Sequence, residues 1–319
     1  MASRALQTTH HIMMVRPANF GFNTETAESN AFQTFDDSED PEFIKEKAIV
    51  EFDTFVNDLR TRGIKVHVIE DTISPVKPDA VFPNNWITFH EDGSIVTYPM
   101  QAEVRRLERR DDIIYELSKD FELSKRFYME QAERSDIFLE GTGSLILDRV
   151  YKIAYACLSP RTDNFLLNTF CENMGYQKAV FHAVDGDGKQ IYHTNVMMAL
   201  GEDFVVICMD SIPDSQEKEE LLYMFEKTGK EVIPISLAQM NSFAGNMLQV
   251  RNETGETYLV MSEQAFNALR ADQIETIRSF TQILHVPIYT IEKYGGGSAR
   301  CMMAEIFLPE KEKLGQEEM

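Results

Sequence analysis

One unit of secondary structure repeats along this chain, and the repeat limits which folds the chain can adopt. Each copy has two short strands joined by a tight turn, then an amphipathic helix, then another strand. The copies recur with a period of about 50 residues along a sequence of 319 residues. A unit of this kind cannot bury its own apolar face, so it must stack on its neighbours. The repeat therefore predicts an α/β fold in which several similar units share a core.

Three copies are clearest in the second half of the chain. Their expected hairpins, helices and strands are, in order, residues 144–157, 164–174 and 177–182; residues 196–209, 215–228 and 231–235; and residues 247–261, 263–279 and 286–291. Turn residues such as Gly201 and Gly255 mark the hairpins, since glycine accepts the backbone angles of a tight turn.

The first part of the chain follows the same pattern less completely. Apolar residues at helical spacing predict a helix over residues 42–62, and Gly63 is a typical C-terminal cap. The other expected elements are strands at 12–15, 64–69, 87–90 and 94–98, and a charged helix at 105–123.

The two ends of the sequence complete the predicted architecture. The apolar segment 301–308 is a suitable partner for the strand that contains residues 13–15, and this pairing would close the units into a ring. The prediction is one closed, propeller-like α/β domain over residues 10–310, with short tails at 1–9 and 311–319. Loops at the strand ends would meet at one central mouth.

Composition restricts the classes of partner. The net charge is −21, and such an acidic surface repels phosphate backbones and anionic lipids, so we expect no nucleic acid and no membrane partner. The four cysteines have no CxxC spacing, and the N-terminus lacks the apolar run of a signal peptide. We therefore expect a cytoplasmic protein that acts on a small molecule.

The segment 295–301, with the sequence GGGSARC, carries the strongest chemical signal. Three glycines let the backbone approach a ligand closely, and Arg300 stands beside Cys301. A nearby cation favours the nucleophilic thiolate of a cysteine. The same segment also fits a glycine turn that leads into a buried strand, with Cys301 as an inert core residue.

Other loops between the repeats contain polar groups that fit either a structural role or a role in a binding site. Residues 78–86 combine an acid, two asparagines and the only tryptophan, which fits either an ordinary turn or a polar pocket wall. Glu140 precedes a glycine turn, Arg161 lies at a strand-to-helix junction, and His193 leads a hairpin. Each of these three also fits a structural or surface role. The sequence shows no metal-ligand spacing and no nucleotide-binding motif, so we expect neither metal nor cofactor.

The order of Glu140, Arg161, His193 and Cys301 resembles that of the arginine deiminase and amidinotransferase superfamily, the pentein fold of five ββαβ units. The resemblance runs from about residue 11 to residue 308 and agrees with the repeat. It rests on the segment 295–301 and on the Glu-Gly and Arg-Thr elements around the acid and the arginine, although Thr142 stands where the family has a second glycine.

The resemblance implies roles for individual residues. Cys301 would be the nucleophile, Glu140 and His193 would manage protons, and Arg161 would hold the α-carboxylate of an amino acid substrate. Segment 242–248 resembles a further family segment near the pocket. Segment 15–23, with the loop of Asn85, points to the amidinotransferase-like enzymes of citrulline use. The substrate site implied in this way contains Asp79, Asn85, Arg161, Phe82, Asn19 and Arg16.

One departure from the family pattern bears on the substrate. Arginine-processing members have an aspartate where this chain has Asn85, and an amide suits a neutral ureido group as well as a cation. Asp79 in the same loop could still supply a charge. We therefore expect a cofactor-free hydrolase that converts citrulline to ornithine, carbon dioxide and ammonia, and that could form a homodimer. The alternatives are a deiminase or dihydrolase of arginine, a hydrolase of dimethylarginine or succinylarginine, an amidinotransferase, and a non-catalytic binding protein.

Overall fold

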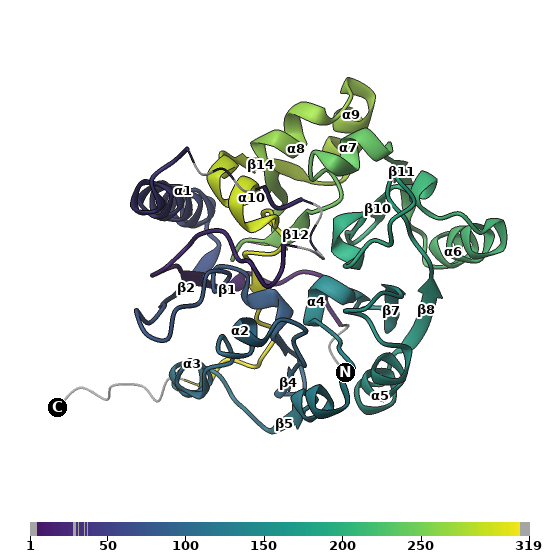
Figure 1. Ribbon diagram of the computed structural model, residues 1–319. Helices are drawn as coiled ribbons and strands as arrows, with labels where there is room; N and C mark the ends of the chain where they lie inside the picture. Colours follow the sequence, from purple (N-terminus) through teal and green to yellow (C-terminus); the bar gives the residue numbers. More distant parts are fainter. Residues whose placement is uncertain (1–4, 28–29, 31, 35, 37, 313–319) are drawn as a thin grey trace.

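The computed structural model describes residues 5–27, 30, 32–34, 36 and 38–312, and within them it contains five three-stranded sheets. Figure 1 shows these sheets arranged around a common centre. In each sheet the middle strand runs antiparallel to one neighbour and parallel to the other. This is the hairpin followed by a further strand that the repeat predicts. Residues 1–4 and 313–319 of the expected tails lie outside the described residues.

The five sheets follow one another along the chain. The first has the order β15–β1–β2, with β1 at His11–Arg16, β2 at Lys65–Glu70 and β15 at Ala304–Glu305. The others are β3 (Ile87–Phe89), β4 (Ser94–Thr97) and β5 (Lys125–Tyr128); β6 (Ile146–Asp148), β7 (Ile153–Cys157) and β8 (Gln177–Phe181); β9 (Met198–Leu200), β10 (Phe204–Ile207) and β11 (Glu231–Pro234); and β12 (Leu248–Arg251), β13 (Thr257–Ser262) and β14 (Gln282–Val286).

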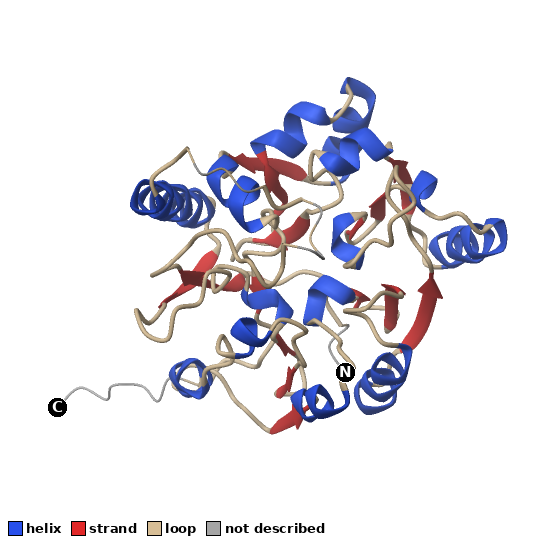
Figure 2. Ribbon diagram, viewed as in Figure 1, coloured by secondary structure: helices blue, strands red, loops and turns tan. Residues whose placement is uncertain are grey.

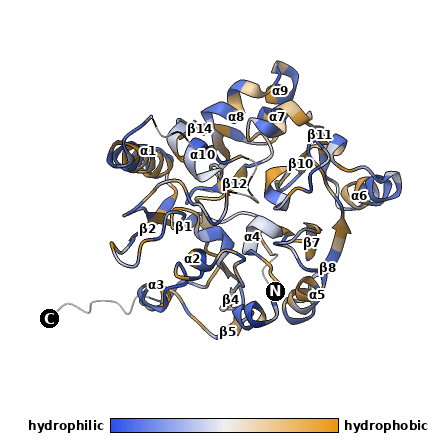
Figure 3. Ribbon diagram, in the orientation of Figure 1, coloured by the Kyte–Doolittle hydropathy of each residue, from blue (hydrophilic) through white to orange (hydrophobic). Residues whose placement is uncertain are grey.

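Helices connect the middle strand of each sheet to the last strand, and Figure 2 shows them on the outside of the sheets. They are α1 (Pro41–Thr61), α2 (Glu103–Arg106) with α3 (Asp111–Leu117), α5 (Asn164–Met174), α6 (Ser215–Lys227), and α8 (Glu263–Ala268) with α9 (Ala271–Phe280). In Figure 3 hydrophilic and hydrophobic residues alternate along these helices, as they do in helices that pack one face on a core.

Helix α1 shows how the sequence produces this packing. Asp40 caps its first turn by accepting a hydrogen bond from the backbone nitrogen of Glu42 at 2.9 Å, and Pro41 occupies the first helical position. The apolar positions predicted from their spacing are all buried: Ile44, Ala48, Phe52, Phe55, Val56 and Leu59. Gly63 follows the helix with a φ of +80°, which an L side chain rarely adopts.

The first and last strands of the chain pair with each other. Strand β1 is antiparallel to β15, with Ile12 opposite Glu305 and Met13 opposite Ala304. The expected strand over residues 301–308 is shorter than predicted, because residues 298–303 form consecutive turns in which Cys301 N donates to Ser298 O at 2.9 Å. Cys301 therefore lies on a turn before the strand.

Three further expectations about elements were wrong. The helix expected at 105–123 is divided into α2 and α3, and the helix expected at 263–279 is divided because Leu269 and Arg270 have extended backbone angles. The strand expected at 286–291 ends at Val286, since Pro287 has no N–H to continue a ladder, and helix α10 (Tyr289–Gly295) follows.

A short connector precedes the first strand of each sheet. The five connectors are the 3₁₀ turns η1 (Pro83–Asn85) and η3 (Thr194–Val196) and the helices α4 (Gly141–Ser144), α7 (Leu237–Asn241) and α10. Figure 1 shows α4 and α10 near the centre of the arrangement, and α4 contacts both η1 and η3. Among the described residues, no helix has the length and apolarity needed to span a membrane.

Candidate active site

A small cavity lies among the connectors. Its walls are formed by Thr26, Asn30, Asp79, Phe82, Asn85, Arg105, Arg161, Tyr192, His193, Gly295, Gly296, Gly297 and Cys301. A larger hollow, lined partly by Phe32 and Phe243, has neither a cysteine nor a histidine in its wall. The cysteine and the histidine singled out in the sequence therefore both lie in the wall of the smaller cavity.

The thiol of Cys301 receives two amide N–H groups. Asn246 Nδ2 lies 3.2 Å from the sulfur and Asn195 Nδ2 lies 3.4 Å from it. The backbone nitrogen of Arg300 donates to Asn246 Oδ1 at 3.1 Å, which fixes the assignment of the amide atoms, and this oxygen also lies 3.6 Å from the sulfur, where it can accept from the neutral thiol. These donors are suited to a thiolate, which accepts hydrogen bonds and is the nucleophilic form of cysteine.

The arginine next to the thiol in sequence has a different partner. Arg300 Nη2 lies 2.8 Å from Glu305 Oε2, and Nη1 donates to Met303 O at 2.8 Å. Both side chains of this ion pair are buried. Arg300 is therefore paired with a buried acid of β15.

Glu140 and His193 form a buried acid–base pair. Glu140 Oε2 lies 2.7 Å from His193 Nε2 and 3.5 Å from Arg161 Nη1, and the backbone nitrogen of Gln101 donates to Glu140 Oε1 at 2.9 Å. Burial by itself would raise the pKa of Glu140, but Arg161 and His193 outweigh it and lower this pKa to about 2. Burial lowers the pKa of His193 below 6.5, against the opposing effect of Glu140. At neutral pH the carboxylate is charged and the imidazole is neutral, ready to accept a proton.

A second buried cluster surrounds Arg105. Its guanidinium lies 2.9 Å from both carboxylate oxygens of Glu108, donates to Asn85 Oδ1 at 2.9 Å, and lies 3.8 Å from Asp79 Oδ2. Asn23 donates to the same Asp79 oxygen at 2.7 Å. Burial raises the pKa of Asp79, and it raises the pKa of Glu108 to about 7 despite the attraction of Arg105. The acids of this wall thus already have a cation beside them.

The glycines before Cys301 have two structural uses. Gly296 ends helix α10 with a φ of +64°, which glycine adopts without strain. A Cβ atom on Gly295 or Gly297 would lie 2.8 Å from the ring of Phe82. The close approach that these glycines permit is therefore to a side chain in the cavity wall, and it draws the loop of Cys301 against the loop of Asn85.

Comparison with known protein families gives one match. Residues 16–308 match the family described as N,N dimethylarginine dimethylhydrolase, eukaryotic. The chain belongs to this family. It is a family of hydrolases that act on C–N bonds, within the pentein superfamily of guanidino-modifying enzymes. A comparison with curated proteins finds no significant match.

Solved structures share the fold of this dimethylarginine dimethylhydrolase family member. The apo structure of ArgZ, an arginine dihydrolase from the ornithine-ammonia cycle in cyanobacteria, superposes with a TM-score of 0.71 at 14% identity. The match covers 95% of this chain but 41% of the ArgZ chain, so this chain spans less than half of that protein. The product-bound N-terminal domain of ArgZ (TM-score 0.70, 15% identity) is matched over 94% of this chain and 99% of its own length.

A structure of dimethylarginine dimethylaminohydrolase, as an adduct with S-methyl-L-thiocitrulline, is also similar. Its TM-score is 0.63 at 17% identity, and the match covers 94% of this chain and all of that one. At these identities the likeness shows the fold, and the chemistry must be argued from the residues of this chain.

The structure brings most of the residues singled out in the sequence to one place. Those that line the cavity are Cys301, His193, Asp79, Asn85, Arg161 and Phe82. Glu140 stands beside His193. Two others lie elsewhere. Arg16 ends β1 and forms an ion pair with Asp53 of α1 at 2.7 Å, and Asn19 donates to Ile73 O at 2.8 Å. Neither contributes to the cavity wall.

Sequence reasoning missed several members of the site. Arg105 was assigned to the charged face of a long helix, because an isolated arginine carries no signal of burial. Asn195 and Asn246 lie within segments that the sequence highlighted, but their contact with the thiol joins residues 106 and 55 positions apart. The best available signal was positional, since each lies shortly before the first strand of a sheet, Asn195 in η3 and Asn246 between α7 and β12.

Proposed function

We propose that this chain hydrolyses the ureido group of citrulline, or of a closely similar amino acid, with Cys301 as the nucleophile. The observation that carries the proposal is the orientation of Asn85. Arg105 offers only N–H donors, so the Asn85 oxygen must face it and the amide nitrogen must face the other way. Among the described residues, Asn85 Nδ2 has no hydrogen-bond acceptor.

The free donor on Asn85 lies beside the catalytic base. A Cβ atom on Gly143 would lie 2.4 Å from Asn85 Nδ2 and 2.8 Å from the ring of His193, so this glycine lets the two side chains approach the same point. A ureido group carries an oxygen that can accept from Asn85. A guanidinium carries only N–H donors, and it would leave the buried donor of Asn85 unpaired at a cost of about 1–3 kcal/mol.

Charge supports the same substrate. A guanidinium is a cation, and it binds well in a buried site only beside a carboxylate that is free to pair with it. In this cavity Arg105 lies between Glu108 and Asp79, and Arg161 lies beside Glu140. Each carboxylate thus has a resident arginine for a neighbour, so a neutral substrate group fits without a further counter-charge.

In the proposed reaction, His193 transfers protons and Cys301 forms the covalent intermediate. His193 accepts the proton of the Cys301 thiol, and the sulfur attacks the ureido carbon. The bond to the terminal nitrogen breaks, and that nitrogen leaves as ammonia with the proton from His193. His193 next takes a proton from water, which attacks the thiocarbamate; the C–S bond breaks and the thiolate is released. The carbamate product loses carbon dioxide and becomes ornithine, so one water is consumed for each citrulline.

Two charged residues would support these steps. Glu140 is ionised at neutral pH and stabilises the imidazolium that His193 forms each time it holds a proton. Arg161 lines the cavity and would bind the α-carboxylate of the substrate, as the family resemblance implies.

One observation favours a second candidate, hydrolysis of arginine or a methylated arginine. Asp79 Oδ1 is buried, lies in the cavity wall, and has no hydrogen-bond partner among the described residues. A carboxylate oxygen of this kind can accept N–H groups from a guanidinium. It can equally accept the ureido N–H or the α-ammonium of citrulline, which is why the orientation of Asn85 decides our choice.

Substrate competition tests the proposal. Ammonia release and amino acid products are measured with citrulline, arginine, asymmetric dimethylarginine and agmatine, each with the native chain and with Cys301→Ser. We expect the highest kcat/KM for citrulline and loss of turnover in the variant. A higher kcat/KM for arginine or dimethylarginine overturns the choice of substrate, and full turnover by Cys301→Ser overturns the role of the thiol. Absence of turnover with all four favours a non-catalytic protein.

We also infer that the five sheets close a ring as one pentein domain over residues 10–310. Support comes from the pairing of β1 with β15. Each of the other four sheets is built from three consecutive strands, whereas the first sheet takes its third strand, β15, from the far end of the chain.

A further inference from the structure

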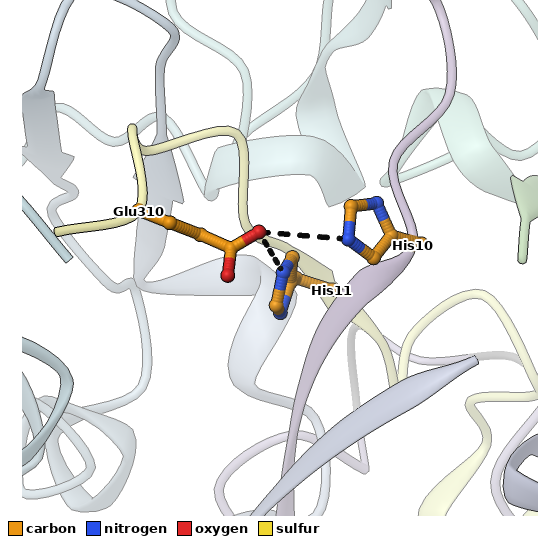
Figure 4. Close-up of side chains that lie close together, drawn as sticks. All are labelled: His10, His11 and Glu310. Carbon is orange, nitrogen blue, oxygen red and sulfur yellow. Dashed lines mark hydrogen bonds and ion pairs between the residues drawn. The ribbon is translucent and has the colours of Figure 1, made fainter. Parts of the chain in front are cut away.

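A cluster of metal-binding side chains lies where the first and last strands of the chain meet. Figure 4 shows His10, His11 and Glu310 directed toward one another. We propose that these three residues bind one divalent transition-metal ion such as Zn²⁺. The inference is independent of the proposed function, because none of the three residues lines the cavity of Cys301.

The ligand atoms have nearly the spacing that such an ion requires. Glu310 Oε1 lies 3.0 Å from His11 Nε2 and 3.7 Å from His10 Nε2, and the three atoms all lie within 4.8 Å of one another. Zinc binds nitrogen and oxygen ligands at about 2.0–2.2 Å in a tetrahedral arrangement, which places the ligands roughly 3.3–3.5 Å apart. Glu310 is half-exposed, so its side chain has room to adjust to this geometry, and three protein ligands would leave the fourth position to water.

A neighbouring histidine supports His11 in the way that metal sites are commonly supported. His67 Nε2 lies 2.9 Å from His11 Nδ1, on the side of the ring away from Glu310. If His11 Nε2 binds the ion, its Nδ1 keeps the proton and donates it to His67, which fixes the tautomer and the ring orientation. Phe121 packs edge-on against both rings, with centroids 5.0 Å and 5.3 Å away.

The charges around the cluster are compatible with a cation. Two neutral imidazoles and one carboxylate carry a net charge of −1. Lys65 lies 3.9 Å from the other oxygen of Glu310, but it lies closer, at 2.9 Å, to Glu253. Arg251 contributes a further positive charge near His10, and Asp120 a negative one near His67. Lys119, Lys311 and Glu312 line the same hollow, so the described surroundings other than Glu310 hold four cations and three acids. The carboxylate of Glu310 brings these charges into balance.

The position of the site suggests what the ion does. His10 and His11 stand at the start of β1, and Glu310 lies 299 positions further along the chain than His11, just beyond β15. A bound ion would join these two segments across the β1–β15 pair, at the end of β1 opposite the chain that continues to Thr26 and Asn30 in the cavity wall. No sequence motif identifies this site, because its ligands come from the two ends of the chain.

Metal binding to the full chain, free of affinity tags and stripped with chelator, tests the proposal. The Cys301→Ser variant is used as the parent, so that no ion is held by the catalytic thiol. Equilibrium dialysis with Zn²⁺ and the visible spectrum of bound Co²⁺ report stoichiometry and ligand geometry. We expect one ion per chain, tetrahedral Co²⁺ bands, and a melting temperature that rises with Zn²⁺ concentration.

Variants locate the ion. Glu310→Gln and His10→Gln should each weaken binding by at least about tenfold, and His67→Phe by about 10–100-fold, the usual effect of losing an outer partner. His182→Gln is the control, since His182 is exposed and pairs with Glu217 elsewhere on the surface. Melting temperatures without metal verify that each variant is folded. The proposal is overturned if the parent binds neither ion, or if Glu310→Gln and His10→Gln bind Zn²⁺ as tightly as the parent does.

Discussion

Replacing Asn85 by aspartate changes one group in the cavity from a hydrogen-bond donor to a charged acceptor. The oxygen that faces Arg105 at 2.9 Å is retained, so the substitution preserves the shape of the side chain. The group beside His193 becomes an oxygen, which repels the ureido oxygen of citrulline and leaves it unpaired. An unsatisfied buried group costs about 1–3 kcal/mol. Since 1.36 kcal/mol is a factor of ten in rate, kcat/KM for citrulline should fall about 5- to 160-fold.

The assay is steady-state ammonia release with citrulline and with arginine at pH 7.5. For arginine the new carboxylate supplies a counter-charge, so kcat/KM should rise or remain unchanged in Asn85→Asp. Asn85→Ala removes the donor without adding charge and should lower kcat/KM for citrulline alone. Asn19→Asp makes the same chemical change outside the cavity and should remain within twofold of the native chain.

One result would refute this reasoning. If Asn85→Asp retains kcat/KM for citrulline within twofold of the native value, or if Asn19→Asp loses as much, the orientation of Asn85 does not select the substrate.

Three other predictions follow from the site. Ionised Glu140 should stabilise the folded state at pH 7 and lose much of that contribution by pH 3, because its folded pKa of about 2 lies below the ordinary 4.5 and its contribution is lost as the pH falls through this interval. Urea unfolding of the native chain and Glu140→Gln measures this difference. A haloacetamidine should label Cys301, located by mass spectrometry, before the cysteines whose pKa burial raises: Cys157, Cys171 and Cys208. Gly143→Ala should lower activity at least about tenfold, because its Cβ would displace Asn85 or His193.

Each of these has a contrary outcome. A stability difference between the native chain and Glu140→Gln that does not shrink toward pH 3 would show that Glu140 is not held ionised. Labelling of Cys171 as fast as Cys301 would remove the evidence for a selectively reactive thiol. Native activity in Gly143→Ala would mean that the contact between the loops of Asn85 and His193 is dispensable.

The repeat was readable from sequence because its signals are local. Helical spacing identified the buried positions of α1, and turn residues marked the hairpins. Strand β5 was not predicted, because its residues, with the sequence KRFY, lie partly or fully exposed and show no alternation of apolar and polar residues. The burial of Arg105 and Glu108 was not predictable either, because their pairing in the interior depends on the surrounding loops and a charged helix pattern carries no sign of it.

The candidate site was predictable only in part. The identities and order of Glu140, Arg161, His193 and Cys301 carried the family resemblance. The orientation of the amide side chains could not be predicted, since each depends on a single donor from a distant part of the chain. Arg105 fixes Asn85 from 20 positions away, and Arg300 fixes Asn246 from 54 positions away. The misplacement of Arg16 and Asn19 has the same origin, because only the packing of β1 on α1 shows that Arg16 meets Asp53.

The central claim is that Cys301 attacks the ureido carbon of citrulline, and a covalent trap tests it most directly. Citrulline labelled with ¹⁴C at the ureido carbon is mixed with the native chain, with Cys301→Ser and with His193→Ala, which lacks the base for both the thiol and the water. The reactions are quenched in acid and digested. The account predicts label on the peptide that contains Cys301 in the native chain, less of it in His193→Ala, and none in Cys301→Ser. Turnover of citrulline without label on that peptide would contradict it.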